Sequence, residues 1–168
     1  MGRIGPYRYP DITLEEARLI LLVNLTYQGT SLDPPYLAKR LGHVNEKSGA
    51  FKRKLQSLRR WGLINRKNKI TPLGLRLASA KTNEEWSKVA VDAFNNVLLF
   101  SQLFTMLNDE GALSSSIFKK HLAILTRAKT EEIEKKWKHI WRVFLNTLES
   151  MEYSPKKARL QILDRRSY

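Results

Sequence analysis

Apolar residues recur at spacings of three and four along most of the chain, which predicts a mainly helical fold. A clear case lies in the first half, where Leu37, Ala38 and Leu41 share one face of a short helix. Asp33 can accept hydrogen bonds from the free N–H groups at the start of that helix, and Pro34 fits its first position. These residues predict a helix that begins at residue 34 and ends near residue 41.

A longer helix is expected after a turn, over residues 46–61. Its apolar stripe consists of Phe51, Leu55 and Leu58, and Gly62 ends it. Two β-prone runs then flank a basic turn, so residues 63–71 are expected to form a small hairpin, with a protruding wing at 65–70. The stretch from residue 33 to residue 72 therefore has the order short helix, turn, longer helix, basic hairpin.

Helices are also expected on both sides of this stretch. Thr13 and Glu16 have the spacing of a capping box, which predicts a helix from there to about Gln28. Another helix is expected over residues 73–80. Residues 1–12 contain two glycines and two prolines, and they predict an extended arm that packs on the domain or is disordered.

The second half of the chain carries two long apolar helices. Residues 84–107 are apolar on nearly all sides, which indicates the centre of a helical bundle, a homodimer interface, or both. Residues 131–149 carry a stripe at three-four spacing, which Thr130 is expected to cap, and they are a second candidate for a homodimer contact. A shorter helix is predicted before them, from the serines at 114–116 to about Thr126.

Three short motifs in the first half occur together in a known family. They are Leu37-Ala38-x-x-Leu41-Gly42, Leu58-x-x-Trp61-Gly62-Leu63-Ile64 and Ile70-Thr71-Pro72-x-Gly74. With the order of the elements, they make residues 13–80 resemble the winged helix-turn-helix family of DNA-binding domains. The resemblance implies a mainly α fold with a small β-hairpin wing, and it implies binding to duplex DNA. After a linker at Lys81–Asn83, a helical domain is expected over residues 84–163, followed by a tail at 164–168.

The second half shows a possible internal repeat of the first. A short helix at 117–125, a longer helix at 131–149 and a possible strand at 159–163 follow the same order as residues 34–71. This order allows a tandem winged-helix architecture with a degenerate second unit. Glu131, Glu132 and Glu134 occupy the helix end that would enter a groove, where they would repel phosphate, so the second unit is not expected to read DNA.

Charge points to the same partner by an independent route. The net charge is +14, with 15 basic and 5 acidic residues up to Ala80, and 15 and 11 after it. Eleven Lys and Arg residues and no Asp or Glu lie between Lys47 and Asn83. A solvated surface normally mixes both signs, so this excess indicates a polyanion, and nucleic acid is the commonest one. Arg3 and Arg8 of the N-terminal arm are also free to touch phosphate.

The apolar stripe of helix 46–61 determines which of its residues point outward. Opposite the stripe lie Gly49, Arg53, Gln56 and Arg60, flanked by Lys52 and Ser57. Because Arg and Gln can bond two atoms of a base edge, this helix is expected in the major groove, with the wing at the adjacent backbone or minor groove. The candidate DNA-binding residues are Lys47, Ser48, Gly49, Lys52, Arg53, Lys54, Gln56, Ser57, Arg59, Arg60, Arg66, Lys67 and Lys69.

Other kinds of site find little support in the sequence. There is no Cys, which excludes disulfides and thiolate metal sites, and the three histidines, His43, His121 and His139, are scattered. No glycine-rich nucleotide loop and no acid pair suited to catalysis is evident, so no enzyme activity, cofactor or metal is predicted. Neither a signal peptide nor a span of about twenty apolar residues is found, so a cytoplasmic protein without membrane contact is expected.

The interpretation that follows is a double-stranded DNA-binding protein that acts as a transcriptional regulator. One alternative is an architectural, replication or plasmid-maintenance factor, which would prefer no particular site as strongly as a regulator does. Another is a winged-helix adaptor that binds protein, in which replacing Arg53 and Arg60 by Glu would leave the complex intact.

Overall fold

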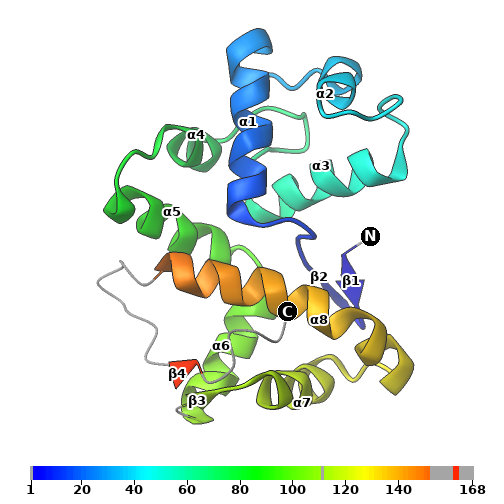
Figure 1. Ribbon diagram of the computed structural model, residues 1–168, viewed down its shortest axis with the longest axis vertical. Coiled ribbons are helices and arrows are strands. Elements are labelled where there is room, and N and C mark those ends of the chain that lie inside the picture. Colours follow the sequence, from blue (N-terminus) through cyan, green and yellow to red (C-terminus); the bar gives the residue numbers. More distant parts are fainter. Residues whose placement is uncertain (1, 111, 152–160, 163–168) are drawn as a thin grey trace.

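The computed structural model describes residues 2–110, 112–151 and 161–162. It is mainly helical, as the apolar spacing predicted, and its elements form two lobes stacked along the long axis (Figure 1). The helices are α1 (Leu14–Gln28), α2 (Pro34–Arg40), α3 (Gly49–Trp61), α4 (Pro72–Ser79), α5 (Asn83–Asn95), α6 (Leu98–Glu110), α7 (Ser115–Thr126) and α8 (Thr130–Ser150). The strands are β1 (Arg3–Ile4), β2 (Tyr7–Arg8), β3 (Ala112–Leu113) and β4 (Gln161–Ile162).

Local signals place most helix ends of the first lobe, which holds α1 to α4. Thr13 and Glu16 form the predicted capping box at the start of α1. The Asp33 carboxylate accepts a hydrogen bond from the Tyr36 N–H at 3.2 Å, with Pro34 as the first residue of α2. These contacts involve residues three positions apart, which is why the sequence alone predicts them.

Helix α3 begins at Gly49 rather than at Glu46, three residues later than predicted. The side chain of Asn45 explains the difference, because its Oδ1 accepts the Lys47 N–H at 2.9 Å. The Ser48 N–H also bonds the Asn45 carbonyl oxygen, at 3.2 Å. Such a local turn competes with the helix for the same backbone groups. Lys47 and Ser48 therefore lie in a turn before the helix.

The predicted wing hairpin is present but very short. Its two sides meet at a single antiparallel bridge, Ile64 to Ile70, and Lys69 makes a further bridge to Ser31. The turn between them is held by Asn65, whose Oδ1 accepts the N–H groups of Lys67 and Lys69. The wing thus rests on three short chain segments rather than on a regular sheet.

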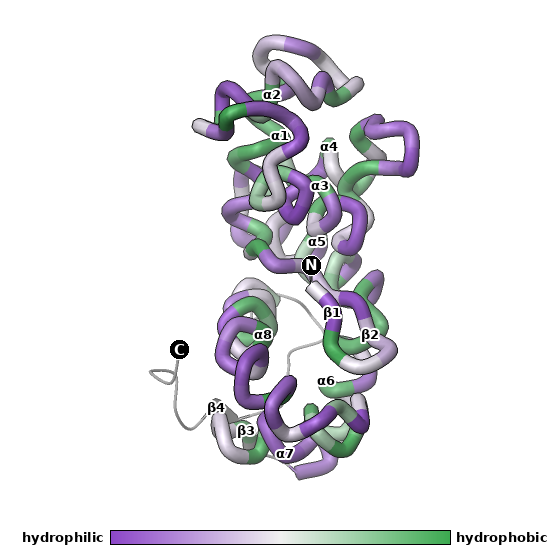
Figure 2. Tube along the Cα trace, turned by 90° about the vertical axis from the view of Figure 1, so that its right-hand side faces the viewer, coloured by the Kyte–Doolittle hydropathy of each residue, from purple (hydrophilic) through white to green (hydrophobic). Residues whose placement is uncertain are grey.

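The first residues form a two-stranded antiparallel hairpin, where an irregular arm was predicted. Strands β1 and β2 pair Arg3 with Arg8 and Ile4 with Tyr7 around a turn at Gly5. Gly5 has φ +54°, and a Cβ there would lie 2.5 Å from the Thr126 carbonyl oxygen, so the turn requires glycine. The side view in Figure 2 shows this hairpin beside α6, so it belongs in space to the second lobe.

The long helix predicted at 84–107 is in fact two helices, α5 and α6, bent by 101°. The break falls at Asn96 and Val97, where the Asn96 side chain donates to the Trp61 carbonyl oxygen at 3.0 Å and Val97 is buried. A contact with a residue 35 positions away thus ends α5. Because the two helices turn different faces inward, the segment can be apolar on nearly all sides.

The second lobe is built around an aromatic cluster that buries the stripes of α5, α6 and α8. Phe118 lies 4.9 Å from Trp141 and 5.2 Å from Phe144 between ring centroids, and Phe94 lies 5.6 Å from Phe144. Buried residues of both lobes form one continuous core. The stripes that allowed either a bundle centre or a homodimer contact are therefore used inside this chain.

The remaining second-half helices match their predicted ranges closely. The Ser114 hydroxyl accepts the Ile117 N–H at 3.2 Å and caps α7 as expected. Thr130, expected to cap the last helix, is instead its first residue, and Lys129 precedes it. The order α6, β3, α7, α8 and β4 resembles that of the first lobe, where isolated bridges at Ser31 and Ile64 stand in the places of the two strands. The predicted tail at 164–168 and most of the predicted last strand lie outside the described residues.

Candidate nucleic-acid interface

The face of α3 that packs inward is the apolar stripe predicted from the sequence. The outward face is therefore the opposite side of the helix. Phe51, Leu58 and Trp61 are fully buried and Leu55 is nearly so. The opposite side of the first two turns is open, and Gly49, Lys52 and Arg53 are exposed there. A Cβ added to Gly49 would meet no atom within 4 Å, so this end of the helix has free space around it.

The candidate residues fall into three groups by exposure. Exposed ones are Lys47, Gly49, Lys52, Arg53, Arg66, Lys67 and Lys69; half-buried ones are Ser48, Lys54, Gln56, Arg59 and Arg60; and Ser57 is buried. The exposed group comes from the start of α3 and from the wing. These two places form the accessible cationic surface of the first lobe, which we call the α3–wing surface.

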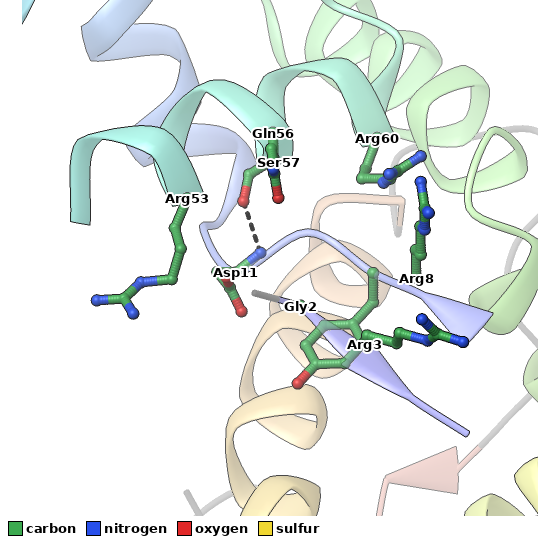
Figure 3. A pocket seen from close by; sticks show the side chains of 9 residues that line it. Gly2, Arg3, Arg8, Asp11, Arg53, Gln56, Ser57 and Arg60 are labelled. Atoms are coloured by element: carbon green, nitrogen blue, oxygen red, sulfur yellow. Dashed lines mark hydrogen bonds between the residues drawn. The ribbon is translucent and has the colours of Figure 1, made fainter. Parts of the chain in front are cut away.

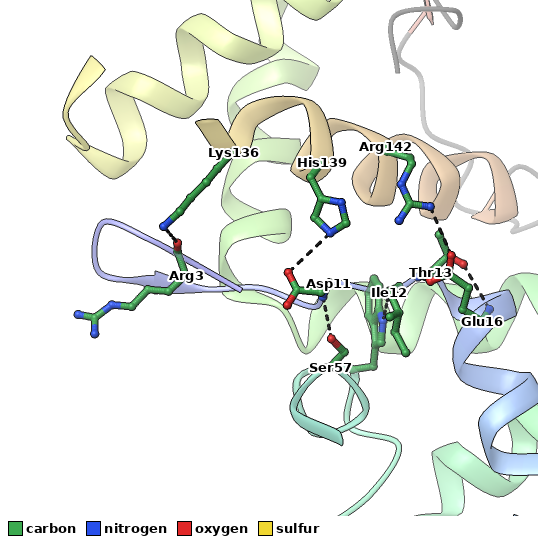
Figure 4. Close-up of polar contacts among 10 residues, drawn as sticks. Arg3, Asp11, Ile12, Thr13, Glu16, Ser57, Lys136, His139 and Arg142 are labelled. Atoms are coloured by element: carbon green, nitrogen blue, oxygen red, sulfur yellow. Dashed lines mark hydrogen bonds and ion pairs between the residues drawn. The ribbon is translucent and has the colours of Figure 1, made fainter. Parts of the chain in front are cut away.

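The helical spacing predicted that Ser57 lies on the open flank of α3, but it does not lie there. Its side chain is 2% exposed, and its Oγ accepts the backbone N–H of Asp11 at 2.7 Å (Figure 4). The Asp11 carboxylate in turn lies 3.6 Å from His139 on α8. The N-terminal segment and the second lobe therefore cover the last two turns of α3, and Ser57 is removed from the candidate DNA contacts.

Arg59 joins α3 to the wing. Its guanidinium donates to Oδ1 of Asn68, the wing residue with φ +59°. Asn tolerates this left-handed conformation better than most residues. The bond fixes the turn that carries Arg66 and Lys67 relative to α3, so Arg59 acts as a link within the surface rather than as an outward cation.

Lys54 is also engaged within the protein. Its Nζ donates to Nε2 of His43 at 2.9 Å, across the turn between α2 and α3. Burial and the neighbouring Lys54 charge lower the pKa of His43, which favours the neutral imidazole that can accept this bond. Lys54 therefore links α3 to the turn that follows α2.

The cations of the α3–wing surface are not neutralised by ion pairs in the described residues. Within the described part of the chain, no ion pair involves a residue between Lys47 and Lys69. The nearest ion pair along the chain joins Arg76 to Asp92 at 2.9 Å, beyond the wing. A surface of this sign without counter-charges attracts phosphate at long range.

The N-terminal arginines lie at a position that the sequence did not predict. Arg3 and Arg8 were expected only to be free for phosphate, yet the hairpin brings both close to the covered end of α3 (Figure 3). The signal was present in part, because Gly5-Pro6 between two short β-prone runs is a turn motif. What the sequence could not show is the surface on which the hairpin packs.

Neither a cluster of metal ligands nor a single membrane-spanning helix is found among the described residues. His121 pairs with Glu110 at 2.8 Å and His139 lies near Asp11, but no group of three His, Cys, Asp or Glu residues forms there. No single described helix is long and apolar enough to cross a membrane, although the bent pair α5 and α6 passes that test together.

Comparisons of the chain with family models, curated proteins and solved structures found no match.

Proposed function

We propose that this chain is a winged helix-turn-helix protein that binds duplex DNA through the α3–wing surface. The observation that carries the proposal is the exposed, acid-free set of cations at the start of α3 and on the wing. The helix N-terminus adds a partial positive charge and free N–H groups at the same place. The transcriptional regulator remains the preferred role, because a protruding helix start suits readout of base edges.

The free end of α3 determines how DNA can dock on the first lobe. Lys52 and Arg53 lie at the open first turns and are the candidates for contacts to base edges and phosphates. Gln56 and Arg60 lie nearer the second lobe, so they meet DNA only at the margin of the interface. The wing residues Arg66, Lys67 and Lys69 are exposed beside this surface and would contact the adjacent backbone.

In this proposal the second lobe supports the first lobe and does not itself bind DNA. The order of its elements matches a degenerate winged-helix unit, but the first turn of α8 carries Glu131 and Glu132, and Glu134 pairs with Lys119 on α7. Acids at the helix end that would enter a groove oppose phosphate binding. With the stripes of α5 and α8 buried in the chain, we do not propose a homodimer through them.

The test is duplex binding by two variants with the same change in net charge. Lys52→Glu/Arg53→Glu alters the α3–wing surface, and Lys120→Glu/Lys135→Glu alters exposed lysines of the second lobe. We expect the first to weaken duplex binding at least tenfold more than the second, measured by fluorescence anisotropy at several salt concentrations. Equal losses would mean that net charge alone attracts DNA, and the proposal would fail.

Site selection from random duplexes separates the regulator from the general DNA-binding factor. A regulator should prefer its selected site by a factor of about 10³ or more over random DNA. A preference near unity would favour the architectural, replication or plasmid-maintenance role. Retention of a protein complex by Arg53→Glu/Arg60→Glu, with no duplex binding by the wild type, would favour the protein adaptor.

A further inference from the structure

A cleft lies between the N-terminal hairpin and the side of α3 that runs from Arg53 to Arg60 (Figure 3). Its volume is about 180 Å³, and four arginines line it from two segments that are far apart in sequence. Arg3 and Arg8 come from the hairpin, and Arg53 and Arg60 come from α3. Gln56 adds an amide to the same wall. We call this site the arginine cleft.

The charge in the arginine cleft is not compensated by the protein. Among the described residues that line it, Asp11 is the only acid, and its carboxylate lies 3.6 Å from His139. Within the described residues Arg8, Arg53 and Arg60 make neither a hydrogen bond nor an ion pair, whereas Arg3 uses only its Nε, toward Gly5. Burial, followed by the charges of Arg8 and Arg59, lowers the pKa of Arg60.

This arrangement of arginines destabilises the protein when no ligand is bound. Arg3 and Arg8 face each other directly across the hairpin, and like charges in that position destabilise a strand pair. Arg60 then adds a third positive group. A structure that holds unpaired cations together at a cost in stability commonly does so for a ligand of opposite charge.

The hairpin is nevertheless fixed firmly in place by other contacts. Ile4 is fully buried, and the Tyr9 N–H donates to the Gly2 carbonyl oxygen at 2.7 Å. From the second lobe, Lys136 Nζ donates to the Arg3 carbonyl oxygen at 2.6 Å, and the Tyr7 hydroxyl donates to Gln102 at 2.7 Å. The cleft is thus preorganised, because both of its walls are held without a ligand.

We propose that the arginine cleft is a binding site for a phosphate group. Guanidinium groups match the geometry of phosphate oxygens and can donate two hydrogen bonds each, and the Gln56 amide supplies a further donor. The source is either a free phosphate or a DNA backbone phosphate next to the end of α3. The second source rests on the proposed function, and it would place one backbone phosphate at the margin of the α3–wing surface.

The first arm of the test uses the protein without DNA. Inorganic phosphate and pyrophosphate are titrated while the Nε–Hε NMR signals of the arginines are followed. We expect saturable shifts of the signals of all four cleft arginines. The shifts of Arg3 and Arg53 should be lost in Arg8→Gln/Arg60→Gln and kept in Arg40→Gln/Arg127→Gln. The control pair is exposed and lies outside the cleft, and it removes the same charge. Shifts of equal size in both variants would overturn the site.

A merely structural role for Arg8 and Arg60 is tested by urea unfolding of the same variants. Removing unpaired like charges should leave the free energy of unfolding equal or higher, although phosphate binding is abolished. A variant that unfolds more readily than the wild type would show that these arginines stabilise the fold, against the proposal. The single variants Arg8→Gln and Arg60→Gln provide the same comparison if the double variant does not fold.

The second arm measures duplex binding against salt concentration. If the cleft holds a backbone phosphate, Arg8→Gln/Arg60→Gln should reduce the slope of log K against log salt by about 0.9 for each phosphate that is no longer neutralised. Phosphate binding at the cleft without any duplex binding would reject the proposed function and keep the cleft as a site for free phosphate. Duplex binding with an unchanged slope, and no arginine shift with phosphate, would reject the cleft and keep the proposed function.

Discussion

The indole Nε1 of Trp61 donates a hydrogen bond to the carbonyl oxygen of Ile12 at 3.0 Å in the core. Trp61 is the last residue of α3, and Ile12 lies just before α1. The Trp61 carbonyl oxygen also accepts the Asn96 side chain at the break between α5 and α6. One residue therefore ties the end of the candidate recognition helix to the N-terminal segment and to the second lobe.

Trp61→Phe should destabilise the protein because it removes this hydrogen bond. The ring still fills most of the site, but the Ile12 carbonyl oxygen loses its buried partner, which typically costs about 1–3 kcal/mol. Urea unfolding followed by circular dichroism measures the effect. Trp137→Phe is the control, because Trp137 is only half-buried and its indole N–H makes no protein hydrogen bond in the described residues. Equal destabilisation by the two substitutions would argue against the role of the Trp61 bond.

Gly62→Ala should be more destabilising than Gly42→Ala. Both glycines follow helices with similar φ, +80° and +83°, so both substitutions incur the left-handed backbone cost of about 1–2 kcal/mol. A Cβ at Gly62 would also lie 2.4 Å from the Asn96 amide nitrogen, whereas one at Gly42 would meet nothing within 4 Å. The difference in the free energy of unfolding therefore measures the crowding at the lobe junction. It should vanish if Asn96 does not pack on Gly62 in solution.

Glu132→Gln should cost stability at neutral pH but not in acid. The hydrogen bond from Lys136, together with the Gly5 N–H and the Arg3 charge, lowers the pKa of Glu132 below its ordinary value of 4.5. A lowered folded-state pKa means that the stabilisation is present above pH 4.5 and disappears as the pH falls through the folded value. Unfolding midpoints of wild type and variant should therefore converge in acid. A difference that persists below that range would contradict the lowered pKa.

Local signals account for the parts of the fold that the sequence predicted. The stripe of Phe51, Leu55 and Leu58, the Asp33 cap and the Gly62 end of α3 all depend on residues within a few positions of each other. The helices of the first lobe followed from these, although α3 begins three residues later than predicted. The sequence therefore sufficed to predict that Lys52 and Arg53 are exposed on α3.

The parts that were missed depend on contacts between distant segments. Asn96 breaks a continuous apolar helix because its amide reaches Trp61, and no pattern within residues 84–107 encodes that distance. Ser57 is buried because Asp11, 46 residues earlier, packs on it. Helical periodicity orients a side chain relative to its own helix only. What covers that side depends on the tertiary fold, which also created the arginine cleft.

Arg66→Gln/Lys67→Gln should weaken duplex binding without changing stability, because both side chains are exposed and neither makes an ion pair in the described residues. If each contacts one phosphate, the slope of log K against log salt should fall by about 0.9 per residue. The reduction in affinity should therefore be larger at low salt than at high salt. Asn68→Gly supplies the matched test of position, since it keeps both cations and tolerates the left-handed backbone but removes the acceptor of Arg59. If the wing works only when held against α3, Asn68→Gly should weaken binding too. Wild-type affinity in both variants would place the wing outside the interface.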